Sequence, residues 1–443
     1  MSLISRFKSI GATKKNVLSN VGWATLGRIV RILTETLVSI FVARYLGPSD
    51  YGLMNYVVSF VAIFTTVSAF GLDNIEIREI AKPENDKNEI LGTAFKLRLI
   101  FAFVAFLSIV VVLLISGTDK YTALLILIYS TSVILSTSNL IRNYFTAIVN
   151  NKYIVITEIL RCLIGALIKV GLLLIKTPLV FFIIALAFDF FLVAGGYLAT
   201  YNKLVGSIKE WRFSKDKAKY LIRESFPLLL SGAAVIVYQR IDQVIIKGLL
   251  NNEAVGYFSV AAKFSEFILF VPLIMSQTIS PLLVSFYASD RETYRKKSQQ
   301  FMDLTVWVSV FLSVLVSVIS YPLIRYTFGT QYLAAVPVLQ VLSFKAIGMA
   351  LSNSCGQLIV IEGVQKWAVI RNLIGCVICV VSNYLLIPKY GVVGSAFATL
   401  VTVAFSGCIG NLFIPPYRHF FKQQISALFM GPVRILRLVI NRQ

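Results

Sequence analysis

The chain has 443 residues, of which 57% are hydrophobic and only 14% are charged, and its formal net charge is +21. A soluble globular domain carries about a quarter charged residues, so this composition excludes an ordinary water-soluble fold and favours a membrane protein. The single histidine argues against a zinc site of the HExxH type, and no Gly-rich loop ending in Gly-Lys-Ser/Thr is present to power an ATP-driven motor.

Residues 1–19 form the first distinct segment, which is basic and amphipathic. Apolar residues such as Leu3 and Phe7 recur at helical spacing among cations such as Arg6 and Lys8. The segment has no apolar core long enough for the central region of a cleavable signal peptide. We therefore expect it to lie on the anionic inner leaflet of a membrane.

Apolar runs of roughly 20 residues follow along nearly the whole chain, and each could cross about 30 Å of hydrocarbon. Polar residues between them predict twelve spans, at 20–46, 51–72, 92–116, 121–148, 154–175, 178–200, 225–250, 255–287, 299–324, 333–361, 367–387 and 391–414. We expect the fold class to be an all-α membrane protein of about 12 transmembrane helices.

The basic residues outside these spans are distributed unequally between the two sides. If both termini are cytoplasmic, the outer loops hold only four cations: Lys120, Lys176, Arg325 and Lys389. The other loops and both terminal segments then hold the rest, as the positive-inside rule requires. The high net charge therefore reflects membrane topology and does not predict a nucleic-acid partner.

The two halves of the chain resemble each other after a shift of about 204 residues. The first half contains ARYLGPSDYGLMNYVVSF, and the second contains IKGLLNNEAVGYFSVAAKF, in which a short turn and Gly256 take the places of a similar turn and Gly52. With six spans per half, the halves share one orientation and are related by a pseudo-two-fold axis along the membrane normal. We expect an N-lobe at 20–200, a basic cytoplasmic linker at 201–224, a C-lobe at 225–414 and a basic interfacial tail at 415–443.

Charged residues inside the spans are the candidate functional residues, because each is costly in hydrocarbon unless it is paired or hydrated. The cations with the best claim to a water-filled cavity for an anionic substrate are Arg28, Arg31, Arg161, Arg240, Lys247 and Lys345. A guanidinium fork suits a phosphate in particular. The alternative is that they form ion pairs between helices or reach the interface, which we favour for Arg371 near a span end.

Acidic residues within the spans have two possible roles. Glu35, Glu158, Asp242 and Asp303 could bind sodium or a proton and couple transport to an ion gradient. They could equally be counter-ions of neighbouring arginines. We expect no metal site and no organic cofactor, and the five cysteines, all in apolar segments, are expected to be packing residues.

The run GRIVRILTETLVSIFVARYLGPSDYGLMNYVVSF and the later GLDNIEIREIAK resemble the opening of polysaccharide-transport proteins of the multidrug/oligosaccharidyl-lipid/polysaccharide (MOP) exporter superfamily. The stretch GYFSVAAKFSEFILFVPLIMSQTISPLL resembles the matching part of their second half. The similarity is to the Wzx-type O-antigen flippases and covers essentially the whole chain. It implies a MATE-like arrangement of two six-helix lobes around a cationic cavity.

The resemblance implies a flippase rather than an enzyme. Such a protein moves an undecaprenyl-diphosphate-linked oligosaccharide from the cytoplasmic to the outer leaflet of the bacterial inner membrane, coupled to H+ or Na+. Membrane lipids, a polysaccharide polymerase and a chain-length regulator are the expected partners. A drug exporter of the same superfamily is the first alternative, and a membrane polysaccharide polymerase is the second, although every outer loop is short.

Overall fold

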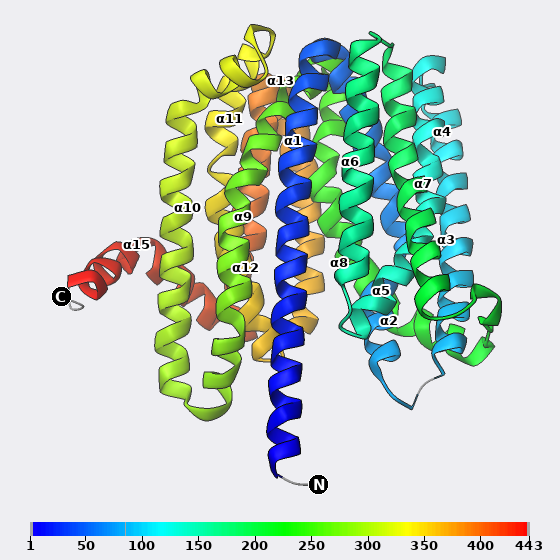
Figure 1. Cartoon of the computed structure of the whole chain (residues 1–443). Coiled ribbons are helices and arrows are strands. Elements are labelled where there is room, and N and C mark those ends of the chain that lie inside the picture. The colour runs from blue at the N-terminus through cyan, green and yellow to red at the C-terminus, as the bar shows by residue number, and fades with distance from the viewer. Residues whose placement is uncertain (1–2, 85, 441–443) are drawn as a thin grey trace. The chain divides into compact units, whose positions relative to one another are not determined.

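The computed structural model describes the backbone of residues 3–84 and 86–440, and the side chains of Gly27 and of residues 30–84, 86–276 and 278–437. Every regular element in these described residues is a helix, and none is a strand (Figure 1). The chain divides into two compact units. The first unit comprises Met1–Leu46 and Val57–Ala233, and the second comprises Gly47–Tyr56 and Ala234–Gln443.

The first unit is built from the N-terminal helices. Its elements are α1 (Leu3–Ala69), α2 (Leu72–Ala81), α3 (Lys87–Ile115), α4 (Lys120–Leu135), α5 (Asn139–Ala147), α6 (Lys152–Leu174), α7 (Leu179–Leu204) and the first part of α8 (Lys215–Leu249). Long helices lie side by side in the order α3, α4, α7 and α6, each packed on the next (Figure 1). The short helices α2 and α5 pack against each other, and their apolar residues, such as Ile75 and Leu140, are part of one buried core.

The second unit contains the rest of α8 and the C-terminal helices. These are α9 (Asn252–Ser289), α10 (Arg291–Thr327), α11 (Val336–Leu342), α12 (Lys345–Ile361), α13 (Ala368–Ala404), α14 (Gly410–Phe413) and α15 (Arg418–Ile440). Helices α9, α10 and α12 pack against one another, and α15 packs along α10. Buried residues such as Phe301, Leu358 and Phe420 form the core that α15 completes.

Two long helices contain sharp kinks where the sequence predicted a break between spans. In α1, Gly47 has a φ of 75°, which the lack of a Cβ allows, and Pro48 follows it. In α13, Gly391 has a φ of 59° and follows Pro388 by three residues. Each of these continuous elements therefore contains two of the predicted spans.

The predicted helical membrane fold is confirmed. Within the described residues, eight helices are long and apolar enough to cross a membrane, or nine if the bent pair Thr330–Leu342 and Lys345–Ile361 is one span. Two of the eight, Val30–Ala81 and Gln365–Phe413, each contain two predicted spans. Helix α6 is missing from this set because its charged residues interrupt the apolar sequence. These elements together account for the twelve predicted spans.

The two turns that identified the internal repeat contact each other within the second unit. A Cβ on Gly52 would overlap the backbone carbonyl of Asn252, and a Cβ on Gly256 would overlap the backbone carbonyl of Pro48. Gly256 and Asn252 are the counterparts of Gly52 and Pro48 under the 204-residue shift, so the contact is reciprocal. Both positions require glycine because the two backbones approach too closely for any side chain.

Candidate charge networks and their family

Charged residues of α1 and α6 pair with each other in the first unit. Arg31 lies 3.5 Å from the Glu158 carboxylate, and the Tyr197 hydroxyl donates to the same carboxylate at 2.9 Å. Arg161 donates to Glu35 at 2.9 Å. Candidate residues predicted on these two spans therefore meet as ion pairs. The predicted residue Arg28 lies in α1, but its side chain is outside the described residues.

Asp189 on α7 adds a carboxylate to the α6 charges. Lys169 donates to it at 2.6 Å, and Arg161 lies 3.8 Å away. These partners of Asp189 are 20 and 28 positions away along the chain, so sequence spacing does not reveal them. Each cation of α6 discussed here has an acidic partner, so this region of the first unit is close to neutral.

A second network in the first unit surrounds Arg98, which lies within the predicted span 92–116. Arg98 is only 2% exposed and donates to both oxygens of Glu76, at 2.6 and 2.8 Å. It also donates to Asp73 at 2.6 Å, and the Asn143 amide donates to both acids. A buried charge of this kind is tolerated because its partners satisfy it fully.

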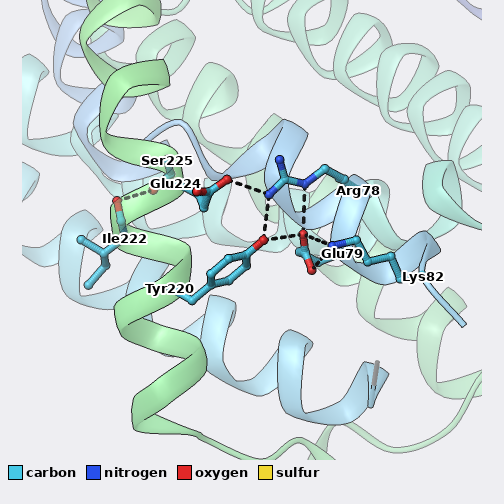
Figure 2. Close-up of polar contacts among 7 residues, drawn as sticks. All are labelled: Arg78, Glu79, Lys82, Tyr220, Ile222, Glu224 and Ser225. Carbon is cyan, nitrogen blue, oxygen red and sulfur yellow. Dashed lines mark hydrogen bonds and ion pairs between the residues drawn. The ribbon is translucent and has the colours of Figure 1, made fainter. Parts of the chain in front are cut away.

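A third network joins α2 to the beginning of α8 (Figure 2). Arg78 donates to Glu79 and to Glu224, each at 3.0 Å, and Lys82 donates to Glu79 at 2.9 Å. Tyr220 on α8 donates its hydroxyl to Glu79 at 3.0 Å. Because Arg78 and Lys82 are more than 40% exposed, we regard this network as a weak link between the linker and α2.

In the second unit, Asp242 on α8 is buried among polar side chains, and we call this group of residues (Asp242, Asn383, Ser395 and Thr399) the Asp242 nest. Asp242 is 3% exposed, and it accepts hydrogen bonds from Asn383 at 2.7 Å and from Thr399 at 2.9 Å. The Ser395 hydroxyl donates to the Asn383 carbonyl at 2.8 Å, and Lys345 interacts with Asp242 electrostatically. The Asn383 amide nitrogen and the Thr399 hydroxyl therefore surround one carboxylate, although no cluster of three His, Cys, Asp or Glu residues occurs among the described side chains.

Arg240 and Lys247, two further predicted cations, lie on α8 in the second unit. Arg240 is partly buried, and it makes no hydrogen bond or ion pair with any described residue. Lys247 lies over the Tyr56 ring, 4.5 Å from its centroid, which is a cation–π contact. Arg240 therefore differs from Arg31 and Arg161 of the first unit, which both form ion pairs.

Asp303 on α10 binds the C-terminal helix. Arg434 of α15 donates to its two oxygens at 2.6 and 2.7 Å, and Gln299 donates at 2.8 Å. The Trp307 indole also donates to the backbone carbonyl of Ala427. The structure therefore places Asp303 in a structural ion pair that anchors α15, and its predicted role in ion coupling is not tested by this contact.

Arg371 on α13 is a residue whose position the sequence misjudged. We expected it to reach the interface or to pair with an acid, but it is 7% exposed and makes no ion pair with any described residue. It donates to the side-chain oxygen of Asn411 at 3.0 Å, and its Nε has no hydrogen-bond partner among the described residues. Its closeness to a predicted span end concealed this burial.

Comparison with known proteins identifies the family. The model of the family described as polysaccharide biosynthesis protein matches residues 17–287, which is more than half of the chain. The chain belongs to this family. The MatE family model also matches residues 227–385. The capsular polysaccharide biosynthesis protein CapF of Staphylococcus aureus is 23% identical over 406 residues, covering 87% of this chain and 96% of CapF.

Solved structures show that this member of the polysaccharide biosynthesis family has the fold of MOP-superfamily transporters. The lipid II flippase MurJ in an inward closed conformation superposes with a TM-score of 0.67 and 16% identity, covering 95% of this chain and 93% of MurJ. An inward-facing multidrug resistance MATE family transporter gives a TM-score of 0.66 and 13% identity, covering 93% of this chain and 98% of that one. The predicted family and fold are confirmed, and the chain is a multi-pass membrane protein of the polysaccharide biosynthesis family.

Proposed function

We propose that this protein flips an undecaprenyl-diphosphate-linked oligosaccharide, the repeat unit of an O-antigen or a similar surface polysaccharide, from the cytoplasmic to the outer leaflet by alternating access. Membership of the polysaccharide biosynthesis family supports the pathway, and the similarity to a lipid II flippase supports a lipid-linked substrate. The distribution of basic loops supports a bacterial inner-membrane location with both termini in the cytoplasm.

One observation carries this proposal: Arg240 lies within a membrane-spanning helix without a hydrogen bond or ion pair to any described residue. A cation in such a place is stable only if water or an anionic ligand compensates it. The diphosphate of the substrate is a ligand of the right charge, and a guanidinium can bind it through two parallel hydrogen bonds. Lys247 and Lys345 are further candidates in the same unit. Arg31 and Arg161 would have to exchange a carboxylate for the substrate, and Arg28 is also a candidate.

The Asp242 nest is the best-supported candidate for ion coupling. Its carboxylate, the Thr399 hydroxyl and the Asn383 amide provide oxygen and nitrogen groups at one buried point. A proton could neutralise the carboxylate, and sodium could replace the hydrogen bonds that Asp242 now accepts. Glu35, Glu158 and Asp303 remain candidates, but each already faces an arginine.

The proposal is tested by deleting the gene in its native host and locating the lipid-linked repeat units with a leaflet-resolved label. We expect complete units to accumulate on the cytoplasmic side and the wild-type gene to restore export. Arg240→Gln should lower export about tenfold or more, because a charge-assisted hydrogen bond is lost. The control is Arg325→Gln, which removes an exposed arginine stacked near Tyr321.

Other outcomes of this experiment identify other functions. Unchanged glycan together with new drug sensitivity would indicate a drug exporter, which the MatE match at 227–385 makes the leading alternative. Single units stranded on the outer leaflet would indicate a polymerase. If the flippase proposal holds, the polysaccharide polymerase and its chain-length regulator are candidate partners, because they act on the unit once it has crossed.

A further inference from the structure

A polar pocket lies within the second unit among α8, α9, α12 and α13. Its volume is about 270 Å³, close to the lower end of the range for small-ligand sites, so it has room for one sugar-sized group. Most of the residues that line it are polar, and they include Tyr238, Asn353, Gln357 and Arg371. Such a concentration of hydroxyl, amide and guanidinium groups inside a membrane protein is costly, so the pocket requires an explanation.

Arg371 supplies the only charge among the lining residues. Arg371 is only 7% exposed, and no described carboxylate forms an ion pair with it. Its contacts within the protein are neutral: the Asn411 side chain and the ring of Tyr417, whose centroid is 5.9 Å from the guanidinium carbon. A buried cation without a counter-ion is strongly unfavourable unless an anion binds beside it.

Two other polar residues that line the pocket have groups without a hydrogen bond to any described residue. Asn353 makes no hydrogen bond with any described residue, and the same holds for the Tyr238 hydroxyl. Tyr238 and Arg371 interact electrostatically, which places the phenol near the guanidinium. An amide offers both donors and an acceptor, and a phenol offers one of each, so these groups match sugar hydroxyls as well as an oxyanion.

We infer that this pocket binds the polar head of the transported substrate, with Arg371 holding an oxyanion and Asn353 and Tyr238 holding neighbouring hydroxyls. The oxyanion is either the carboxylate of an acidic sugar or a phosphate. The identification of the ligand with the substrate rests on the proposed function, whereas the oxyanion site rests on the pocket. This site differs from the candidates on α8. Its charged residue is Arg371, which the sequence predicted to reach the interface or to form an ion pair.

The test is ligand binding to the purified full-length protein in detergent, measured by calorimetry. The probes are glucuronate, glucose as the matched neutral sugar, and inorganic phosphate. We expect saturable binding of glucuronate or phosphate, with glucose at least about tenfold weaker, because glucose cannot form the charge-assisted bond. Competition between glucuronate and phosphate distinguishes the two sources: the probe that binds more tightly identifies the group that Arg371 holds.

Two substitutions of Arg371 separate charge from structure. Arg371→Gln removes the charge and keeps an amide donor for Asn411, and it should weaken oxyanion binding about tenfold or more. Arg371→Lys keeps the charge and should retain part of the binding. Asn353→Ala changes a partly buried residue without a hydrogen bond and should weaken the carboxylated sugar several-fold more than phosphate. Arg325→Gln is the control and should bind every probe as the wild type does.

Binding of neither oxyanion to the wild type would overturn the inference, as would unchanged binding in folded Arg371→Gln protein. If Arg371→Gln does not fold, Asn353→Ala and Arg371→Lys decide: both binding the carboxylated sugar like the wild type would overturn it. The leaflet assay is independent of this result. A protein that exports glycan but binds no probe overturns only the pocket, and one that binds but leaves glycan distribution unchanged on deletion overturns only the flippase.

Discussion

The two units of this protein treat intramembrane charge differently. In the first unit, Arg31, Arg161 and Lys169 each have a carboxylate within 4 Å. In the second unit, Arg240 and Arg371 have none among the described residues. The halves of the chain resemble each other in sequence, and their turns around Gly52 and Gly256 make reciprocal contacts, so these charges differ although the two halves are similar.

The contrast indicates which charges stabilise the fold and which are available to bind a ligand. In a buried ion pair, each charge is neutralised by its partner within the protein, so the substrate does not have to neutralise it. An unpaired buried cation makes the empty protein less stable than it could be, and that cost is recovered only when an anion binds. Substitutions of paired charges should therefore lower the stability of the fold, whereas substitutions of unpaired charges should lower transport.

The largest effect is expected at the buried Arg98 network. Glu76→Ala removes the carboxylate that accepts two hydrogen bonds from Arg98 and leaves that cation with Asp73 alone. Loss of one partner of a buried pair costs about 3–5 kcal/mol of unfolding free energy. Thermal unfolding of the purified protein measures the effect, and a melting temperature equal to that of the wild type would show that the network is not structural.

The next effect is expected where α15 is anchored. Arg434→Ala leaves the buried Asp303 carboxylate with only Gln299 as donor, and we expect a loss of about 2–3 kcal/mol. The contact between Arg434 and Asp303 attaches α15 to α10, so its loss should also make α15 sensitive to protease. Limited proteolysis followed by mass spectrometry locates the cut. Asp303→Asn in the same background should recover part of the stability, since it removes the uncompensated charge.

A functional effect without loss of stability is expected at Asp242. Asp242→Asn keeps an acceptor for Asn383 and Thr399 in nearly the same volume, so the fold should persist. If Asp242 couples transport to an ion, the variant should lose about tenfold of its response to a sodium or proton gradient, which corresponds to about 1.4 kcal/mol. Transport into vesicles with imposed gradients measures this response. A full response in the variant would move the coupling site to Glu35, Glu158 or another acid.

The smallest effect is expected at the network of Figure 2. Arg78 and Glu224 are both more than a third exposed, so solvent screens their attraction. A double-mutant cycle with Arg78→Ala and Glu224→Ala should give a coupling energy of about 1 kcal/mol or less. The same cycle at Arg98 and Glu76 should give several-fold more, and similar values at the two sites would contradict the distinction between buried and exposed pairs.

Much of the fold was predictable because helices in a bilayer must satisfy their own backbone hydrogen bonds. Apolar length then locates the spans, and Gly47–Pro48 and Pro388 with Gly391 locate the kinks that separate two pairs of them. The sequence also identified Glu158 and Arg161 of α6 as charges within a span. The Asp189 partner of Arg161 could not be assigned, since α6 and α7 have no sequence signal that specifies which faces meet.

Arg371 shows where sequence reasoning stops. Its closeness to a span end suggested an interfacial residue, but the chain buries it against Asn411 and the Tyr417 ring. These residues lie 40 and 46 positions further along the chain, so the hydrophobicity of α13 could not predict the contacts. The amino-acid sequence by itself determined that this is a twelve-span membrane protein with two similar halves, because hydropathy and the positive-inside rule act on local segments. Only the tertiary structure decided which charges are neutralised and which are left unpaired, because pairing depends on distances of a few ångströms between residues far apart in the chain.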